Sequence, residues 1–138
     1  MAKIYSKVFF GNKIVELEEA NLSVASSAVL YGLSVYTVFP ISNNQKGGCA
    51  AFRLEDHFNR LIDSAKIVGI YDFEKHWGLK KFSEAVHKLV AANKPNENVF
   101  ARATVHVDDL VAGTRSRGLH TSLSIFLYEA ASILPREG

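Results

Sequence analysis

The sequence lacks the features that mark secreted and membrane-spanning proteins. Its single cysteine, Cys49, excludes a disulfide within the chain and favours a reducing compartment. No stretch approaches the roughly 18 consecutive apolar residues of a membrane-spanning helix. Lys3 and Lys7 also interrupt the N-terminal region before a signal-like apolar run develops. We therefore expect a soluble, cytoplasmic protein with no membrane partner.

A strong charge of either sign is also missing. The 16 Lys and Arg residues are nearly balanced by 14 Asp and Glu residues, which leaves a formal net charge of +2. So small and dispersed an excess does not indicate a surface for a polyanion. Nucleic acid is therefore not expected as a partner.

No internal repeat or low-complexity tract occurs, and what remains is the composition of one globular domain. The chain has 138 residues, of which 48% are hydrophobic, enough to bury a sizeable core. Strands come first, then two helices, then strands again. This order predicts a single α+β domain over residues 1–138, with a mostly antiparallel sheet covered on one face by two helices.

Turn residues between apolar runs predict the strands. Gly11 and Asn12 tolerate the positive φ of a tight turn and predict a hairpin within residues 3–17. Pro40 cannot donate a hydrogen bond to a neighbouring strand, so it should lie at an edge or an end of its ladder. The further strands are expected at residues 34–42, 49–54, 98–107 and 120–130.

Apolar residues at three- and four-residue intervals predict two long helices, over about residues 54–68 and 74–92. Gly69 stands where it can end the first helix. The first stripe comprises Leu54, Phe58, Leu61, Ile62, Ala65 and Val68, and the second comprises Trp77, Phe82, Ala85, Val86, Leu89 and Val90. A loop or a brief helix is expected after Ser23, Ser26 or Ser27, with Gly32 at its end.

Arg60 lies on the side of the first helix that faces away from its apolar stripe, about 200° from Phe58 on a helical wheel. Asp56 and Asp63 are close enough in sequence for ion pairs worth a few tenths of a kcal/mol each. A guanidinium also presents paired donors that match phosphate or carboxylate oxygens. The residues by themselves leave both explanations open.

Other reactive side chains give weaker signals. The five histidines lack the spacing of metal ligands and are expected to be solvated. Cys49 is expected to be a small strand residue and not a nucleophile. Arg115 and Arg117 lie in a glycine-containing loop without the strand-to-helix context of a phosphate loop, so a flexible or disordered loop is expected there.

Two segments, ANLSVASSAVLYGLSVYTVF and FRLEDHFNRLIDSAKIVGI, resemble the N-terminal domain of the fold type IV pyridoxal-phosphate enzymes, above all the branched-chain amino acid aminotransferases. The resemblance continues through NVFARATVHV. It implies that Arg60 holds the phosphate of pyridoxal 5'-phosphate. It further implies that Tyr31 and Tyr36 line the substrate pocket, that Arg102 helps to recognise a substrate carboxylate, and that the protein forms a homodimer.

The strand pattern places Arg102 on the same face as Phe100, Thr104 and His106, opposite the core. Its alternative reading is a solvated strand arginine. The resemblance also has departures. Where the family commonly has an acidic residue, a glycine and then an arginine, this chain has Thr37, Val38 and Pro40. The preferred substrate is therefore left open.

The family's imine-forming lysine lies in a second, larger domain, and none of the lysines of these 138 residues stands in the matching motif. The expectation is a small domain without the C-terminal lysine-bearing domain, either a fragment or a split or degenerate gene product. By itself it should be inactive. A non-catalytic dimerising or ligand-binding module, a D-amino acid aminotransferase and an aminodeoxychorismate lyase are the alternatives.

Overall fold

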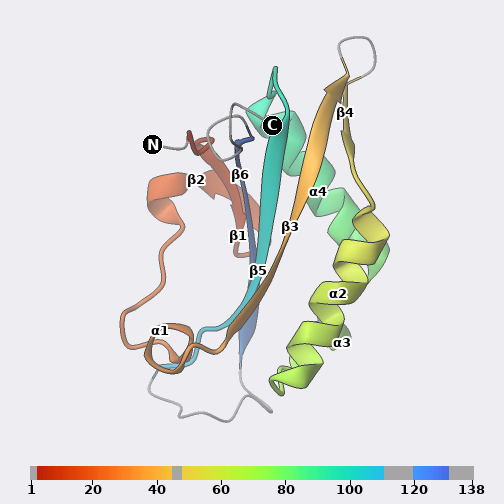
Figure 1. The fold of residues 1–138 in the computed structure, drawn as a ribbon. Coiled ribbons are helices and arrows are strands. Elements are labelled where there is room, and N and C mark those ends of the chain that lie inside the picture. Colours follow the sequence, from red (N-terminus) through yellow and green to blue (C-terminus); the bar gives the residue numbers. More distant parts are fainter. Residues whose placement is uncertain (1–2, 45–47, 111–119, 131–138) are drawn as a thin grey trace, which may run out of the picture.

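A computed structural model of the chain describes residues 3–44, 48–110 and 120–130 (Figure 1). The strands are Lys7–Phe10 (β1), Lys13–Glu16 (β2), Ser34–Asn44 (β3), Gly48–Ala51 (β4), Val99–Val107 (β5) and Thr121–Glu129 (β6). The helices are the 3-10 turn Leu17–Glu19 (η1) and the α-helices Ser27–Tyr31 (α1), Leu54–Ile67 (α2), Asp72–His76 (α3) and Leu79–Asn93 (α4).

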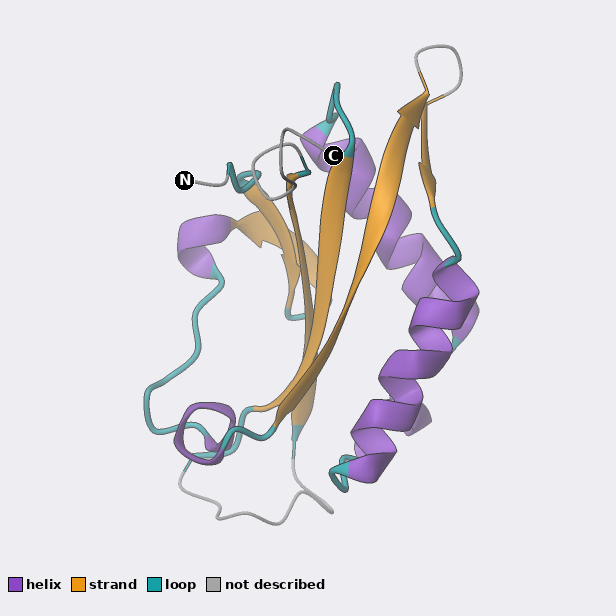
Figure 2. Ribbon diagram, in the orientation of Figure 1, coloured by secondary structure: helices purple, strands orange, loops and turns teal. Residues whose placement is uncertain are grey.

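The described strands form one six-stranded antiparallel sheet in the order β2-β1-β6-β5-β3-β4. Figure 2 shows α2, α3 and α4 on one side of this sheet and α1 near its lower end on the other side. The α+β class and the antiparallel sheet are therefore confirmed. The covered face carries three helices, one more than the sequence predicted.

The β1–β2 hairpin forms because its turn residues accept the left-handed backbone. Gly11 and Asn12 both have φ of 63°. These are the angles of a primed turn, whose twist matches that of two antiparallel strands. At α1, the Ser26 hydroxyl accepts a hydrogen bond from the Val29 amide, and Gly32 ends the helix at φ 65°. Both local predictions are confirmed.

Helix α2 begins and ends close to its predicted bounds. Phe58, Leu61 and Ala65 are buried, whereas Leu54 and Ile62 are half-buried at the border of the core. Gly69 has φ of 87° and follows the last turn, as predicted. Val68 was predicted in the apolar stripe, but it is 43% exposed because it is the C-terminal capping residue, where the chain leaves the helical path.

The second long helix is broken, contrary to the sequence prediction. Trp77 and Gly78 adopt extended backbone angles between α3 and α4. The break turns the indole of Trp77 into the core, where it stacks on Phe73 at a centroid distance of 6.3 Å and contacts Phe9 edge-on at 5.7 Å. Packing of one large aromatic ring thus outweighs the hydrogen bonds of a continuous helix.

The core lies between the sheet and the three helices. Every second residue of β5, from Val99 to Val107, is fully buried there, which confirms the predicted alternation. Phe39, Phe82 and Leu89 are also fully buried, and each such side chain stabilises the fold by about 1.5–3 kcal/mol. Among the described helices, none is long and apolar enough to cross a membrane.

Candidate functional site

A groove of about 570 Å³ lies between α2 and the first half of β3. Arg60 and Ser64 line it from the helix, and residues 34–38 line it from the strand. The groove exists because β4 pairs only with residues 41–44 of β3, so that the strand's first half forms the edge of the sheet. It is the candidate functional site of the chain.

The side chain of Arg60 is exposed at this groove. Asp56, one of its two potential partners, instead binds Arg53, with 2.6 Å between the Arg53 Nη2 and Asp56 Oδ2 atoms. No carboxylate among the described residues lies within ion-pair distance of Arg60. The local ion-pair explanation is therefore wrong for these residues, and the guanidinium is available for an anion from outside.

Peptide groups of β3 form the opposite wall of the groove. The Pro40 carbonyl accepts a hydrogen bond from the Phe52 amide, so the peptide groups of even-numbered residues in this strand point away from β5. Those of Tyr36 and Val38 therefore face the groove, where no strand pairs with them in the described sheet. Pro40 sits where the β4 ladder ends, as predicted, because its nitrogen faces that side.

His57 and Thr37 join the two walls beneath the groove. The Nδ1 atom of His57 lies 3.0 Å from the hydroxyl oxygen of Thr37, which is 3% exposed. Burial lowers the pKa of His57, and the positive charges of Arg60 and Arg53 lower it further, against an opposing effect of Asp56. The imidazole is therefore neutral at neutral pH, and Arg60 is the charge that faces the groove.

Tyr36 and Arg102 meet on the helix-free face of the sheet. The guanidinium carbon of Arg102 lies 3.8 Å above the centre of the Tyr36 ring, a cation–π contact that orients the arginine on the strand. Burial raises the pKa of the Tyr128 phenol, and Arg102 lowers it by a smaller amount. Tyr36 also lines the groove of Arg60. Two of the four predicted site residues therefore line the groove, and a third, Arg102, contacts one of them.

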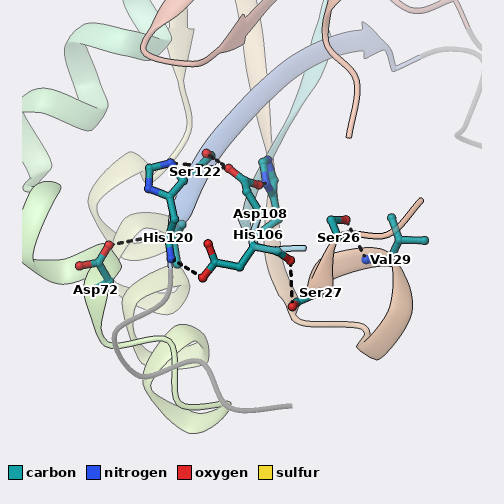
Figure 3. A network of polar contacts seen from close by, with 10 residues as sticks. Ser26, Ser27, Val29, Asp72, His106, Asp108, His120 and Ser122 are labelled. Carbon is teal, nitrogen blue, oxygen red and sulfur yellow. Dashed lines mark hydrogen bonds and ion pairs between the residues drawn. The ribbon is translucent and has the colours of Figure 1, made fainter. Parts of the chain in front are cut away.

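Tyr31 is the exception. It is the last residue of α1, is 42% exposed and is not among the residues that line the groove. Helix α1 lies at the end of the sheet and is tied there by a hydrogen bond from the Ser27 hydroxyl to the Asp109 carbonyl (Figure 3). Within this one chain, Tyr31 is therefore not brought to the Arg60 groove.

A second polar network lies at the ends of β5 and β6 (Figure 3). The His106 Nδ1 atom contacts the Asp108 carboxylate at 2.6 Å, and the Ser122 hydroxyl donates to the other carboxylate oxygen. His106 is only 3% exposed. The prediction of a solvated histidine is therefore wrong here, because Asp108 and Ser122 satisfy polar groups that burial removes from water.

Sequence reasoning missed the parts of the site that depend on tertiary contacts. The sequence predicts a solvated His57, although its position three residues before Arg60 places both on one side of the helix. The sequence marks Thr37 only as a departure from the family pattern and does not reveal it as a partner of His57. Arg115 and Arg117, and the side chain of Cys49, lie outside the described part of the structure.

Two curated relatives illustrate the sequence similarity. The chain is 28% identical over 141 residues to a probable branched-chain-amino-acid aminotransferase of Synechocystis sp., a match that covers 100% of the chain and 44% of that protein. It is 31% identical over 106 residues to the branched-chain-amino-acid aminotransferase of Salmonella typhimurium, covering 77% of the chain and 33% of that protein. The chain thus spans less than half of these relatives. No family model matches it.

Solved structures share the fold. The branched-chain aminotransferase of Thermoproteus uzoniensis, crystallised with norvaline, superposes with a TM-score of 0.80 at 29% identity, over 91% of this chain and 41% of that one. The Escherichia coli enzyme gives a TM-score of 0.78 at 28% identity, over 91% and 40% of the two chains. In sequence and in fold, the chain is therefore similar to the part of the branched-chain aminotransferases that these matches cover.

Proposed function

We propose that the chain is the phosphate-anchoring half of a pyridoxal 5'-phosphate-dependent branched-chain amino acid transaminase. The complete enzyme would transfer the amino group of such an amino acid to 2-oxoglutarate. The observation that carries the proposal is the Arg60 guanidinium, which faces a groove without a carboxylate partner among the described residues. The relatives in sequence and fold name the reaction class.

The residues of the groove fit the phosphate of this cofactor. Arg60 supplies a permanent charge and paired N–H donors, and the Ser64 hydroxyl lines the groove one helical turn away. The Tyr36 and Val38 amides point into the same space. One arginine and one strand edge leave the groove open on its remaining sides, so this chain should bind the cofactor weakly. Further residues of the complete enzyme would enclose the cofactor.

When bound, the cofactor supplies the electron sink that labilises the substrate Cα–H bond. The role of this chain would be to position the cofactor. Arg60 would fix the phosphate end, and the edge of β3 would limit how far the ring can shift relative to the substrate. No lysine lines the described groove, so the amine that binds the cofactor covalently would have to come from outside it.

Arg102 would recognise a carboxylate of the amino acid or the 2-oxo acid. The stacked Tyr36 ring leaves the guanidinium edges available for two parallel hydrogen bonds. Val38 is the cross-strand neighbour of Arg102 and, with Val35, gives the groove part of an apolar lining. That surface suits an aliphatic side chain better than a charged one.

We further propose a homodimer in which Tyr31 serves the pocket of the second copy. Tyr31 does not line the groove of its own chain. It belongs instead to the exposed apolar residues in and beside α1, here called the α1 patch, which comprises Val24, Val29, Leu30, Tyr31 and Leu110. The cytoplasmic location stays a prediction from the sequence.

The proposal is tested by titrating the chain with pyridoxal 5'-phosphate and with pyridoxal, which lacks the phosphate, while recording NMR chemical shifts. Arg60→Gln should weaken binding of the phosphorylated compound about tenfold, the effect of losing a charge-assisted contact, and leave pyridoxal binding unchanged. Lys80→Gln is the matched control, because Lys80 is an exposed cation of α4 that does not line the groove. Equal binding by Arg60→Gln and the parent chain would refute the phosphate role.

A second candidate function is a non-catalytic ligand-binding module of the same fold, which the lack of a lysine in the described groove favours. Both candidates predict that this chain alone does not transaminate leucine and that borohydride treatment with the cofactor labels no lysine. Turnover by the chain alone would contradict both. Gain of turnover on adding a lysine-bearing second domain would select the transaminase.

A further inference from the structure

We infer that Thr37 is a positioning residue for Arg60, acting through its hydrogen bond to His57. The inference rests on the proposed anion-binding role of Arg60 and goes beyond it, because Thr37 carries no charge and its side chain is buried. Three observations support it: the contact between strand and helix, the arrangement of side chains along α2, and the electrostatic coupling of His57 to Arg60.

The contact joins the two walls of the groove directly. Thr37 is in β3, between the two residues whose peptide groups face the groove. Its hydroxyl oxygen lies 3.0 Å from the His57 Nδ1 atom in α2. The Phe39 ring, two residues further along β3, packs against the same imidazole at a centroid distance of 5.5 Å. The imidazole is therefore held by two neighbouring side chains of one strand.

The helix transmits this constraint to the anion site. His57, Arg60 and Ser64 are spaced by three and four residues, so they lie on one side of α2. Fixing the imidazole fixes the rotation of that side relative to β3. An arginine side chain has many rotamers. It loses less conformational entropy on binding an anion when the backbone that carries it is already held in place. The partly buried hydrogen bond therefore holds the base of the Arg60 side chain at a fixed distance from the strand edge.

Electrostatic interaction also couples His57 to Arg60. The charged groups that act on His57 are Arg53, Asp56 and Arg60, all from α2, whereas Thr37 and Phe39 from β3 are uncharged. An anion bound by Arg60 would cancel part of the positive charge near the imidazole. By linkage, anion binding should then raise the pKa of His57.

The test compares Thr37→Val, which keeps the shape and removes the hydroxyl, with Thr37→Ser, which restores it. Thr104→Val is the matched control, because Thr104 is a strand threonine that does not line the Arg60 groove. The probe is inorganic phosphate, titrated by NMR with the Arg60 side chain as the reporter. Thr37→Val should weaken phosphate binding about fivefold, the effect of one ordinary hydrogen bond, whereas Thr37→Ser and Thr104→Val should match the parent chain.

A ligand-free measurement separates this inference from the proposed function. The NMR order parameter of the Arg60 Nε–H group should fall in Thr37→Val and stay unchanged in Thr104→Val. If that parameter is the same in all variants, the positioning role is overturned, whatever the phosphate result. If Arg60→Gln binds phosphate as the parent does, the proposed function falls, while the order parameter still decides the role of Thr37.

The titration of His57 gives the third readout. In the parent chain, the pKa of His57 should rise when phosphate is added, and Arg60→Gln should raise it without any ligand. Both shifts follow from removing or neutralising the same positive charge. A His57 titration that is indifferent to Arg60→Gln would overturn the coupling on which the inference depends.

Discussion

Arg60 and Arg53 show how the surroundings of a residue decide what its charge can do. Both are arginines of the same segment, seven residues apart, and both are exposed. Arg53 is held by Asp56 at 2.6 Å, whereas Arg60 opens onto a groove. A surface ion pair contributes little to stability, but here it occupies Asp56, one of the two carboxylates that Arg60 could pair with along the helix. The two arginines therefore differ in whether their charge is available to a ligand.

At the same scale, Asp108 gives a prediction for acid stability. Burial acts to raise the pKa of this carboxyl, but hydrogen bonds from His106 and Ser122 and the nearby histidine charges leave it below its ordinary value of 3.8. A carboxyl whose pKa is lowered in the folded protein stabilises the fold at pH values above its ordinary pKa. This contribution is lost as the pH falls through the lowered pKa.

Asp108→Asn should therefore lower the free energy of unfolding by about 1 kcal/mol at pH 7, and the difference from the parent should vanish towards pH 2. Urea unfolding at several pH values checks this. The exposed Asp63→Asn is a suitable control with little expected effect. A pH-independent difference would show that the charge of Asp108 is not what stabilises the network.

Arg102 gives a second prediction at the residue scale. Its charge lowers the pKa of the Tyr128 phenol against the larger opposing effect of burial. Arg102→Met keeps much of the apolar stem, so it should raise the pKa of Tyr128 further. NMR titration of ring-labelled tyrosine measures this. Lys88→Met is the control for a distant positive charge, because Lys88 is exposed on α4, on the other side of the sheet. A Tyr128 pKa unaffected by Arg102→Met would contradict the contact.

At the scale of elements, backbone geometry explains where the helices end. Gly32 has φ of 65° at the end of α1, whereas Gly78 has φ of −122° at the start of α4. An added Cβ would meet no atom within 4 Å at either position. The two glycines therefore differ in backbone conformation and not in available space.

Gly32→Ala should consequently destabilise the fold by about 1 kcal/mol, while Gly78→Ala should change the free energy of unfolding by less than about 0.5 kcal/mol. Thermal and urea unfolding of the two variants provide the comparison. Equal effects would mean that the positive φ of Gly32 is not the source of the cost. The Gly32 variant should also displace the adjacent Tyr31.

In the part of the chain that the structure describes, helices form a layer over one face of the sheet, and the other face has no such layer. Helices α2, α3 and α4 bury the first face, and the second carries Tyr36 and Arg102 with α1 at its end (Figure 2). An open face bordered by the exposed α1 patch is typical of a surface that meets another chain or domain. This asymmetry is the structural reason to expect a second copy beside α1.

The proposed homodimer predicts that Leu30→Glu in the α1 patch weakens self-association about tenfold or more, because a buried charge without a partner is costly. Sedimentation equilibrium over a range of concentrations measures the dissociation constant. Ile67→Glu is the control, since Ile67 is 84% exposed at the end of α2, outside the patch. A monomeric parent, or a dimer disrupted only by Ile67→Glu, would contradict the proposed interface.

The amino-acid sequence by itself determined the elements whose signals are local. The Gly11-Asn12 turn, the α2 stripe and the alternation of β5 follow from backbone preferences and from periodicities of 3.6 and 2 residues. The order of these elements was sufficient for the α+β class, and the match to family segments pointed to Arg60. Each of these inferences needs only residues close together in the chain or a known motif.

Only the tertiary structure decided which partners those residues have. It broke the second helix at Trp77, buried His106 against Asp108, and left Arg60 without Asp56 beside an open strand edge. It also joined Thr37 to His57 across 20 residues of sequence. The physical reason is that such contacts reflect competition among many groups for a few buried positions, and the outcome depends on the packing of the whole domain.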